Sequence, residues 1–174
     1  GHGDLVALDH SADETVDYVV HVMSHWLDRG AAGWRLDAAY AVPSPFWARV
    51  LPQVKAAHPY SWIFGEVIHG DYPRIIEEST MDSITQYELW KSIQHALETE
   101  NFFELDWNLK RHNAFLDSFV PQTFIGNHDV TRIASQIGPA KAALALAVLM
   151  TVGGVPSIYY GDEQGYVGVK QERF

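Results

Sequence analysis

Short apolar strands alternate with helical segments along the chain, and this alternation constrains the fold more than any other feature. Five segments have the composition of buried strands, namely residues 33–36, 61–65, 81–87, 122–126 and 156–160. Helical periodicity fills most of the intervals between them. The strands are nearly unbroken hydrophobic runs, as expected when both faces of a sheet are covered. The pattern predicts an α/β architecture with a parallel sheet.

The number of strands decides between two versions of that architecture. An eight-stranded parallel (β/α) barrel of TIM type typically needs about 250 residues, whereas this chain has 174. Five strands form either an open sheet or part of a larger barrel. The closing segment 166–174 has no natural stop, which favours the barrel. We therefore predict that residues 1–174 are a partial (β/α)8 domain with about five of the eight units, the remaining strands coming from a longer parent chain.

Charge and composition exclude several classes of partner. The chain has 12 Lys and Arg against 22 Asp and Glu, a formal charge of −10, so we expect no nucleic-acid partner and no anionic membrane surface. The longest apolar run, 142–152, is too short to span a bilayer, and the first residues lack the pattern of a signal peptide. Without cysteine, disulfide and thiolate chemistry are excluded. A neutral ligand fits this balance best, and the composition does not indicate a compartment.

Three acidic residues follow apolar strands at the point where each strand ends. Asp37 closes Trp-Arg-Leu-Asp, Glu66 closes Ile-Phe-Gly-Glu, and Asp129 closes Phe-Ile-Gly-Asn-His-Asp. The carboxyl ends of parallel strands carry the active site in α/β folds. We therefore expect the three carboxylates to converge on one cleft.

Two carboxylates can hydrolyse a glycosidic bond if their surroundings separate their pKa values. Arg35 lies two residues before Asp37 and projects to the same face of the strand, which would keep Asp37 ionised, as a nucleophile requires. Glu66 follows apolar residues and has no cation adjacent in sequence, which would suit a general acid. This assignment is a hypothesis from the residues alone.

Other interpretations of these residues remain open. The same three acids could hold Mg²⁺ in a metal-dependent barrel enzyme, although Arg35 beside them argues against it, and we predict no metal site. His21 and His25 have metal-ligand spacing on one helix, but they lie opposite its apolar face and are expected to be solvated. His58, His95 and His112 show no acidic partner at useful spacing and are predicted to lie on the surface.

Four segments of the chain, in the right order and at the right spacing, resemble the α-amylase family, glycoside hydrolase family 13. They are Gly-Trp-Arg-Leu-Asp at 33–37, Phe-Gly-Glu-Val at 64–67, Phe-Ile-Gly-Asn-His-Asp at 124–129 and the stretch 154–163. They resemble the segments at the ends of barrel strands four, five, seven and eight. Gly3-Asp4-Leu5 is also similar to a short loop ahead of strand four, so the resemblance covers nearly the whole chain.

The resemblance implies a retaining glycoside hydrolase or transglycosylase acting on α-glucosidic bonds. Asp37 would be the nucleophile that forms a covalent glycosyl intermediate, and Glu66 the general acid and then the general base. Asp129 would grip sugar hydroxyls more tightly in the transition state than in the ground state. Substrate-binding roles are also implied: Arg35 would position the nucleophile, and His128 and Arg132 would contact the sugar.

The chain departs from the family pattern in two places. The D-x-x-x-N-H segment of the third strand, which supplies a sugar-binding histidine and often a calcium ligand, is absent. The lysine–histidine pair that many endo-acting amylases carry after the nucleophile is replaced by Ala39-Tyr40-Ala41. We therefore expect no cofactor in this segment, calcium only in a full-length parent, and a maltodextrin-like or short α-glucoside as substrate.

A non-catalytic relative, kept as an α-amylase-like binding module, is the alternative of a different class. Such relatives usually lose acids, and this sequence keeps all three. The resemblance also implies that the isolated chain, lacking strands of the barrel, is poorly active or inactive while its parent is active.

Overall fold

A computed structural model describes residues 6–171 of the chain, so the expected loop at Gly3-Asp4-Leu5 lies outside the described residues. The described residues form two compact units. The N-terminal unit comprises residues 6–66 and 71–82, and the C-terminal unit comprises residues 67–70 and 83–171.

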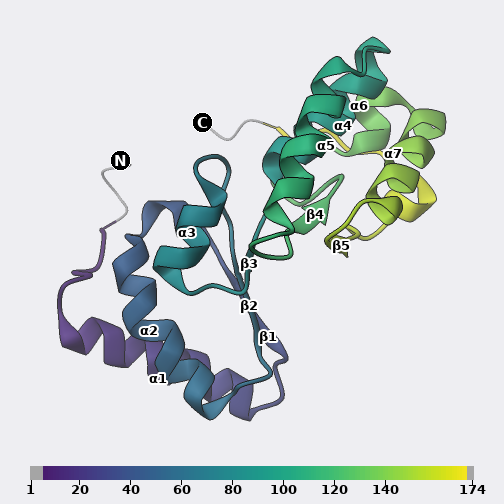
Figure 1. Ribbon diagram of the computed structural model, residues 1–174. Coiled ribbons are helices and arrows are strands. Elements are labelled where there is room, and N and C mark those ends of the chain that lie inside the picture. Colours follow the sequence, from purple (N-terminus) through teal and green to yellow (C-terminus); the bar gives the residue numbers. More distant parts are fainter. Residues whose placement is uncertain (1–5, 172–174) are drawn as a thin grey trace. The chain divides into compact units, whose positions relative to one another are not determined.

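The N-terminal unit combines two parallel strands with three α-helices and a short 3-10 helix (Figure 1). Its elements are α1 (Asp13–Asp28), β1 (Gly33–Leu36), the short 3-10 helix η1 (Ala39–Ala41), α2 (Ser44–Ala57), β2 (Trp62–Gly65) and α3 (Tyr72–Ser79). α1 packs against α2, and α2 packs against α3. Because a helix connects β1 to β2, the two strands pair in parallel, as the sequence predicts.

The apolar faces of the helices form the core of this unit. Val16, Met23 and Leu27 recur at helical spacing and are buried on α1. The helix is followed by Gly30, whose φ of 100° is a left-handed conformation that glycine adopts without steric strain. In α2 the apolar residues around Val50 remain buried although Pro52 lies inside the helix.

The C-terminal unit contains three strands and four α-helices (Figure 1). Its elements are β3 (Ser83–Ile84), α4 (Tyr87–Thr99), α5 (Phe103–Phe115), β4 (Gln122–Phe124), α6 (Ile133–Ile137), α7 (Pro139–Thr151), β5 (Val155–Ser157) and the 3-10 helix η2 (Asp162–Gln164). β4 and β5 pair in parallel, and Thr85 forms an isolated parallel bridge with Gln122. A core of aliphatic side chains from α4, α5, α6 and α7 includes the fully buried Leu89 and Leu149.

The five predicted strands are all present; β1 has its predicted bounds, and the other four are shorter than the sequence indicates. The segment 81–87 contains only the two-residue β3. Helices α3 and α6 are not predicted from the sequence, since their 8 and 5 residues are fewer than the window of about 11 over which helical periodicity is judged. Among the described residues, no helix combines the length and apolar character needed to cross a membrane.

The prediction for the three histidines is wrong in part. His112 is fully buried, and its Nε2 lies 2.6 Å from the Gly153 carbonyl oxygen. His58 lies 3.3 Å from Asp28, and the exposed His95 pairs with Glu104. These partners come from other elements of the fold, so spacing along the sequence does not reveal them. Burial lowers the pKa of His112, and its hydrogen bond with Gly153 opposes that effect.

Candidate active site

The register of β1 and β2 places the first two predicted acids beside each other. Arg35 pairs with Phe64, and Leu36 pairs with Gly65. Asp37 and Glu66 are the next residues on each strand, and neighbouring strands are about 4.8 Å apart. The two carboxylates therefore leave adjacent strands at the same edge, as the sequence predicts.

The Arg35 guanidinium contacts both of these carboxylates. Its Nη1 lies 2.6 Å from Oδ1 of Asp37, and its Nη2 lies 3.2 Å from Oε1 of Glu66. Glu66 has no cation beside it in the sequence, but Arg35 is beside it in the structure, so the expectation of surroundings without a cation is wrong. The Arg35 side chain spans the distance to the neighbouring strand, which sequence adjacency does not show. Proximity to a cation thus does not distinguish the two acids.

The second oxygen of Glu66 is held by the backbone. The Ala38 N–H donates to Oε2 of Glu66 over 2.9 Å. Ala38 has a φ of 45°, in the left-handed region that costs about 1–2 kcal/mol for a residue with a side chain. Glu66 is nearly buried, with 10% of its side chain exposed, whereas 77% of the Asp37 side chain is exposed. Strain of this kind clusters at functional sites.

The third predicted acid lies in the C-terminal unit, in the loop between β4 and α6. Asp129 is held by its neighbours: its N–H donates to Oδ1 of Asn127 over 2.9 Å, and its Oδ2 lies 3.1 Å from Nε2 of His128. Nζ of Lys170 lies 3.8 Å from its Oδ1. The Asp129 side chain is 43% exposed. Asp129 belongs to a different unit from the other two acids, so the convergence of all three stays a prediction.

Arg132 has several partners within the C-terminal unit. Its Nη1 donates to Oδ1 of Asp162 over 3.0 Å and to the Tyr160 carbonyl over 2.9 Å. Its guanidinium carbon lies 4.5, 4.9 and 5.9 Å from the ring centres of Tyr159, Tyr160 and Tyr166. Only 11% of the Arg132 side chain is exposed. The predicted contact of Arg132 with the sugar stays a prediction.

Asp162 is a buried acid to which the sequence analysis assigned no role. Its side chain is fully buried, and its Oδ2 has no hydrogen-bond partner among the described residues. Burial raises the pKa of Asp162, while the Arg132 guanidinium opposes that shift. The cue in the sequence is its position five residues past β5, at the same strand end as the other acids.

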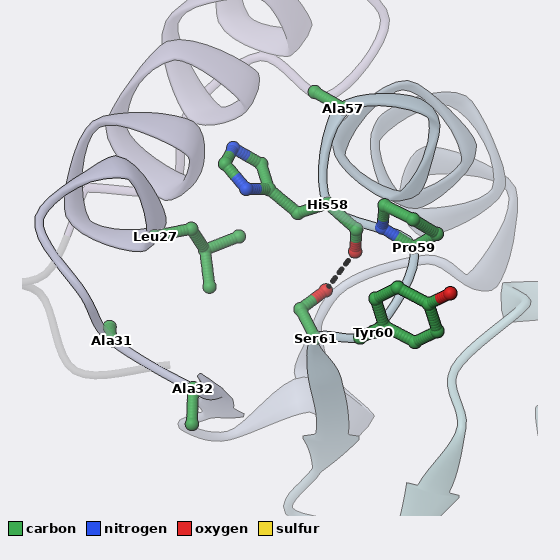
Figure 2. A pocket seen from close by; sticks show the side chains of 8 residues that line it. All are labelled: Leu27, Ala31, Ala32, Ala57, His58, Pro59, Tyr60 and Ser61. Atoms are coloured by element: carbon green, nitrogen blue, oxygen red, sulfur yellow. Dashed lines mark hydrogen bonds between the residues drawn. The ribbon is translucent and has the colours of Figure 1, made fainter.

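A pocket of about 430 Å³ in the N-terminal unit lies away from the two acids. Its lining residues lie around the starts of β1 and β2, whereas the acids follow the strand ends (Figure 2). In this pocket the Ser61 hydroxyl donates to the His58 carbonyl over 2.8 Å, and the Tyr60 side chain is almost fully exposed. The pocket is a feature separate from the candidate active site.

The described residues do not fit a metal centre. No cluster of three or more His, Asp or Glu side chains with the geometry to hold an ion occurs within residues 6–171. The spacing of His21 and His25 therefore does not produce a site with a third ligand from this part of the chain. The expectation that this segment holds no cofactor stays a prediction.

Known proteins were compared with the sequence. Residues 2–174 match the family profile described as the α-amylase catalytic domain. The chain is 32% identical to neopullulanase 2 of Thermoactinomyces vulgaris, covering 89% of this chain and 28% of the relative. It is 32% identical to a cyclomaltodextrinase of Thermoanaerobacter pseudethanolicus with the same coverage. It is 28% identical to a 4-α-glucanotransferase of Thermotoga neapolitana, covering 93% of this chain and 37% of the relative.

Solved structures show the same likeness in the fold. An Anoxybacillus α-amylase aligns with a TM-score of 0.82 at 24% identity, over 94% of this chain and 39% of that one. A Nostoc punctiforme debranching enzyme aligns with a TM-score of 0.79 at 25% identity, over 92% of this chain and 39% of that one. The chain thus spans between about a quarter and two fifths of the length of these relatives. It belongs to the α-amylase family, glycoside hydrolase family 13, and its parallel βα units are part of that family's TIM-type barrel.

Proposed function

We propose that the protein containing this chain is a retaining glycoside hydrolase or transglycosylase that acts on α-glucosidic bonds through a covalent glycosyl-Asp37 intermediate. The observation that supports it best is the pair of carboxylates at the ends of adjacent strands, which share the Arg35 guanidinium. A retaining mechanism needs two carboxyl groups about 5–5.5 Å apart. The spacing of neighbouring strands, about 4.8 Å, is compatible with that separation.

In the first step, an oxygen of Asp37 attacks the anomeric carbon while the glycosidic bond breaks. Glu66 gives its proton to the departing oxygen, so that the leaving sugar departs as an alcohol. In the second step, Glu66 takes a proton from water or from a sugar hydroxyl, whose oxygen then displaces Asp37. The exposure of Asp37 suits attack on a ligand, and its contact with Arg35 holds one of its carboxylate oxygens in place.

Donors on both of its oxygens hold the Glu66 carboxyl group in a fixed position. In the structure Arg35 contacts one of its oxygens and the Ala38 N–H donates to the other. Both donors are close to Asp37 in the sequence, Arg35 on β1 and Ala38 directly after Asp37. A movement of the backbone at the nucleophile would therefore also move the groups that hold the general acid. For Asp129 we propose a grip on sugar hydroxyls in the transition state, assisted by His128, on the strength of the sequence motif that holds them.

The names of the relatives support a substrate of the α-glucan class. Their names describe a neopullulanase, a cyclomaltodextrinase and a 4-α-glucanotransferase. These activities include both hydrolysis and glucosyl transfer, and we propose a maltodextrin-like or short α-glucoside for this protein. Chromatography of the products that the full-length enzyme forms with maltotriose as substrate distinguishes the two reactions. Transfer gives sugars longer than maltotriose, whereas hydrolysis gives only shorter ones.

The decisive experiment replaces the proposed acid in the full-length protein. We expect Glu66→Gln to slow glucosides with poor leaving groups by about 10²–10⁴-fold and to affect activated aryl glucosides much less, because these leave without a proton. Glu78→Gln is the matched control, since Glu78 is also paired with an arginine but is exposed on α3. Equal slowing of both substrate types would remove Glu66 from the acid role. Binding of maltodextrin without any turnover by the wild type would favour the non-catalytic alternative.

A further inference from the structure

The segment that follows β5 wraps around the loop that carries Asp129. We refer to residues 158–170 as the post-β5 segment. Its Gly168 carbonyl accepts from the Arg132 N–H over 3.0 Å, and the Gly168 N–H donates to the Ser135 hydroxyl over 2.8 Å. Further along, the Lys170 N–H donates to the Thr131 hydroxyl over 3.0 Å. The loop is thus held by residues roughly 30–40 positions further along the chain.

One buried contact anchors this arrangement. The Arg132 guanidinium is bonded to Asp162 and to the Tyr160 carbonyl, both in the post-β5 segment, and tyrosine rings lie around it. An arginine that combines a carboxylate partner with aromatic faces is fixed in orientation, because its planar fork has several directional donors. Arg132 is also the N-cap residue of α6, immediately after the loop. Its position therefore sets the end of the Asp129 loop.

The segment that follows β4 packs against the Asp162 side of the Arg132–Asp162 pair. A Cβ atom added to Gly126 would lie 2.5 Å from Oδ2 of Asp162. The carboxylate therefore lies directly against the backbone that leads from β4 to Asp129. With its side chain fully buried, Asp162 is positioned to contact the scaffold of the loop and not a ligand.

We propose that Arg132 is a positioning residue for Asp129, acting through its buried pair with Asp162, and not a direct ligand of the sugar. The inference rests on the proposed function, because it requires Asp129 to act on the substrate. The physical argument is one of geometry: a carboxylate on an exposed loop acts in the transition state only if the loop is fixed to within a fraction of an ångström. A misplacement of about 1 Å reduces the rate on the order of 10²-fold.

The test compares variants of the full-length enzyme. Arg132→Met and Asp162→Ala should each lower kcat on the order of 10²-fold and leave KM within about threefold, because an interaction of the transition state is lost. Arg132→Lys keeps the charge and should restore part of the loss. The control is Lys141→Met, which removes the more exposed ion pair between Lys141 and Glu100 in the same unit and should leave kcat unchanged.

A double-mutant cycle with Asp129→Asn separates positioning from other roles. If Arg132 acts through Asp129, Arg132→Met should add little to the loss already caused by Asp129→Asn, measured on an activated glucoside. If the losses in kcat of the two single variants multiplied in the double variant, the proposal would be overturned. It would also be overturned if Arg132→Met raised KM while Asp162→Ala left KM unchanged, because Arg132 would then be a sugar ligand. A lower Tm with unchanged kcat would also overturn it, by reducing the pair to a structural role. Full activity of Asp129→Asn would instead refute the proposed function itself.

Discussion

The two regions that carry the predicted acids use arginine in different ways. In the N-terminal unit, Arg35 is two residues from Asp37 on an extended strand, and its side chain contacts that acid and its neighbour Glu66. In the C-terminal unit, Arg132 is three residues past Asp129, and its guanidinium bonds to Asp162. The comparison shows that the spacing along the sequence predicts the partner of an arginine on a strand, where residues i and i+2 share a face. The spacing does not predict the partner of an arginine that follows a loop.

The two regions also differ in what holds the acids in place. Asp37 and Glu66 directly follow a parallel β-ladder, so the pairing of β1 and β2 brings them to the same edge. Asp129 lies on a loop that is held by the post-β5 segment, including Lys170. We therefore expect the first arrangement to be less sensitive to substitutions far along the chain than the second. The predictions below test that difference.

The largest effect is expected for the arginine that contacts both acids. Arg35→Met removes the contacts to Asp37 and Glu66, and kcat/KM of the full-length enzyme should fall by about 10²–10³-fold, comparable to the loss of one preorganised donor. Arg35→Lys should recover little, because an ammonium group lacks the fork that reaches two carboxylates at once. Steady-state kinetics measures both variants.

The control for this prediction is Arg74→Met, which removes an exposed pair with Glu78 and should leave kcat/KM unchanged. If Arg35→Met left kcat/KM unchanged, as Arg74→Met should, the contact of Arg35 with the two acids would have no part in the reaction. The proposed difference between the roles of Arg35 and Arg132 would then be refuted.

Gly126 after β4 and Gly65 at the end of β2 allow the two units to be compared by the effect of alanine on stability. Gly126→Ala would place its Cβ atom 2.5 Å from the Asp162 carboxylate, so the buried pair must shift. We expect a loss of about 1–3 kcal/mol in the free energy of unfolding, measured by urea denaturation. Gly168→Ala is the control, since its Cβ atom would make only ordinary contacts, the nearest at 3.5 Å with Arg132.

In the N-terminal unit, Gly65→Ala should also destabilise, but through apolar crowding against Met81 and Ala39. Its effect should therefore be independent of Asp162, whereas the effect of Gly126→Ala should shrink when Asp162 is already alanine. Additive losses for Gly126 and Asp162 would contradict the contact that the structure shows between them.

A buried histidine should make the stability of the C-terminal unit depend on pH. Burial lowers the pKa of His112 in the folded state, while in the unfolded chain it is about 6.5. Between these two values the unfolded state binds more protons, so the free energy of unfolding decreases as the pH falls below about 6.5. At higher pH the contribution is fully present.

The measurement is a series of urea denaturations between neutral and mildly acidic pH. His112→Gln keeps a donor for the Gly153 carbonyl and should lose part of the acid-dependent decrease, at a cost of about 1 kcal/mol at neutral pH. His21→Gln is the control, because His21 is exposed on α1. An identical pH dependence in both variants would mean that His112 does not titrate differently in the folded state.

The sequence predicts the part of the fold that follows from local pattern. The strands, the main helices and the placement of Asp37 and Glu66 at one edge follow from hydrophobic periodicity and from the rule for parallel sheets. The short α3 and α6 are missed, because their 8 and 5 residues are fewer than the window of about 11 over which helical periodicity is judged. The element bounds shift by a few residues for the same reason.

Side-chain partners across elements could not be predicted in this way. The contact of Arg35 with Glu66, the burial of His112 against Gly153 and the pair of Arg132 with Asp162 all join segments separated by about 30–40 residues. A single sequence specifies such contacts only through the complete three-dimensional packing. The positions of Asp37 and Glu66 at adjacent strand ends follow from their own motifs, whereas contacts that depend on a distant partner do not follow from any motif.

The smallest effect is expected for Lys170, the exposed contact to the Asp129 loop. Its Nζ lies 3.8 Å from the Asp129 carboxylate and 2.8 Å from the His128 carbonyl, and the lysine and Asp129 side chains are 42% and 43% exposed. Exposed ion pairs contribute about 0–1 kcal/mol, so Lys170→Met should lower kcat/KM by no more than about fivefold. Salt screens such pairs, so the difference between variant and wild type should narrow in about 1 M NaCl. A loss as large as that of Arg132→Met would show that the exposed contact, and not the buried pair, fixes the loop.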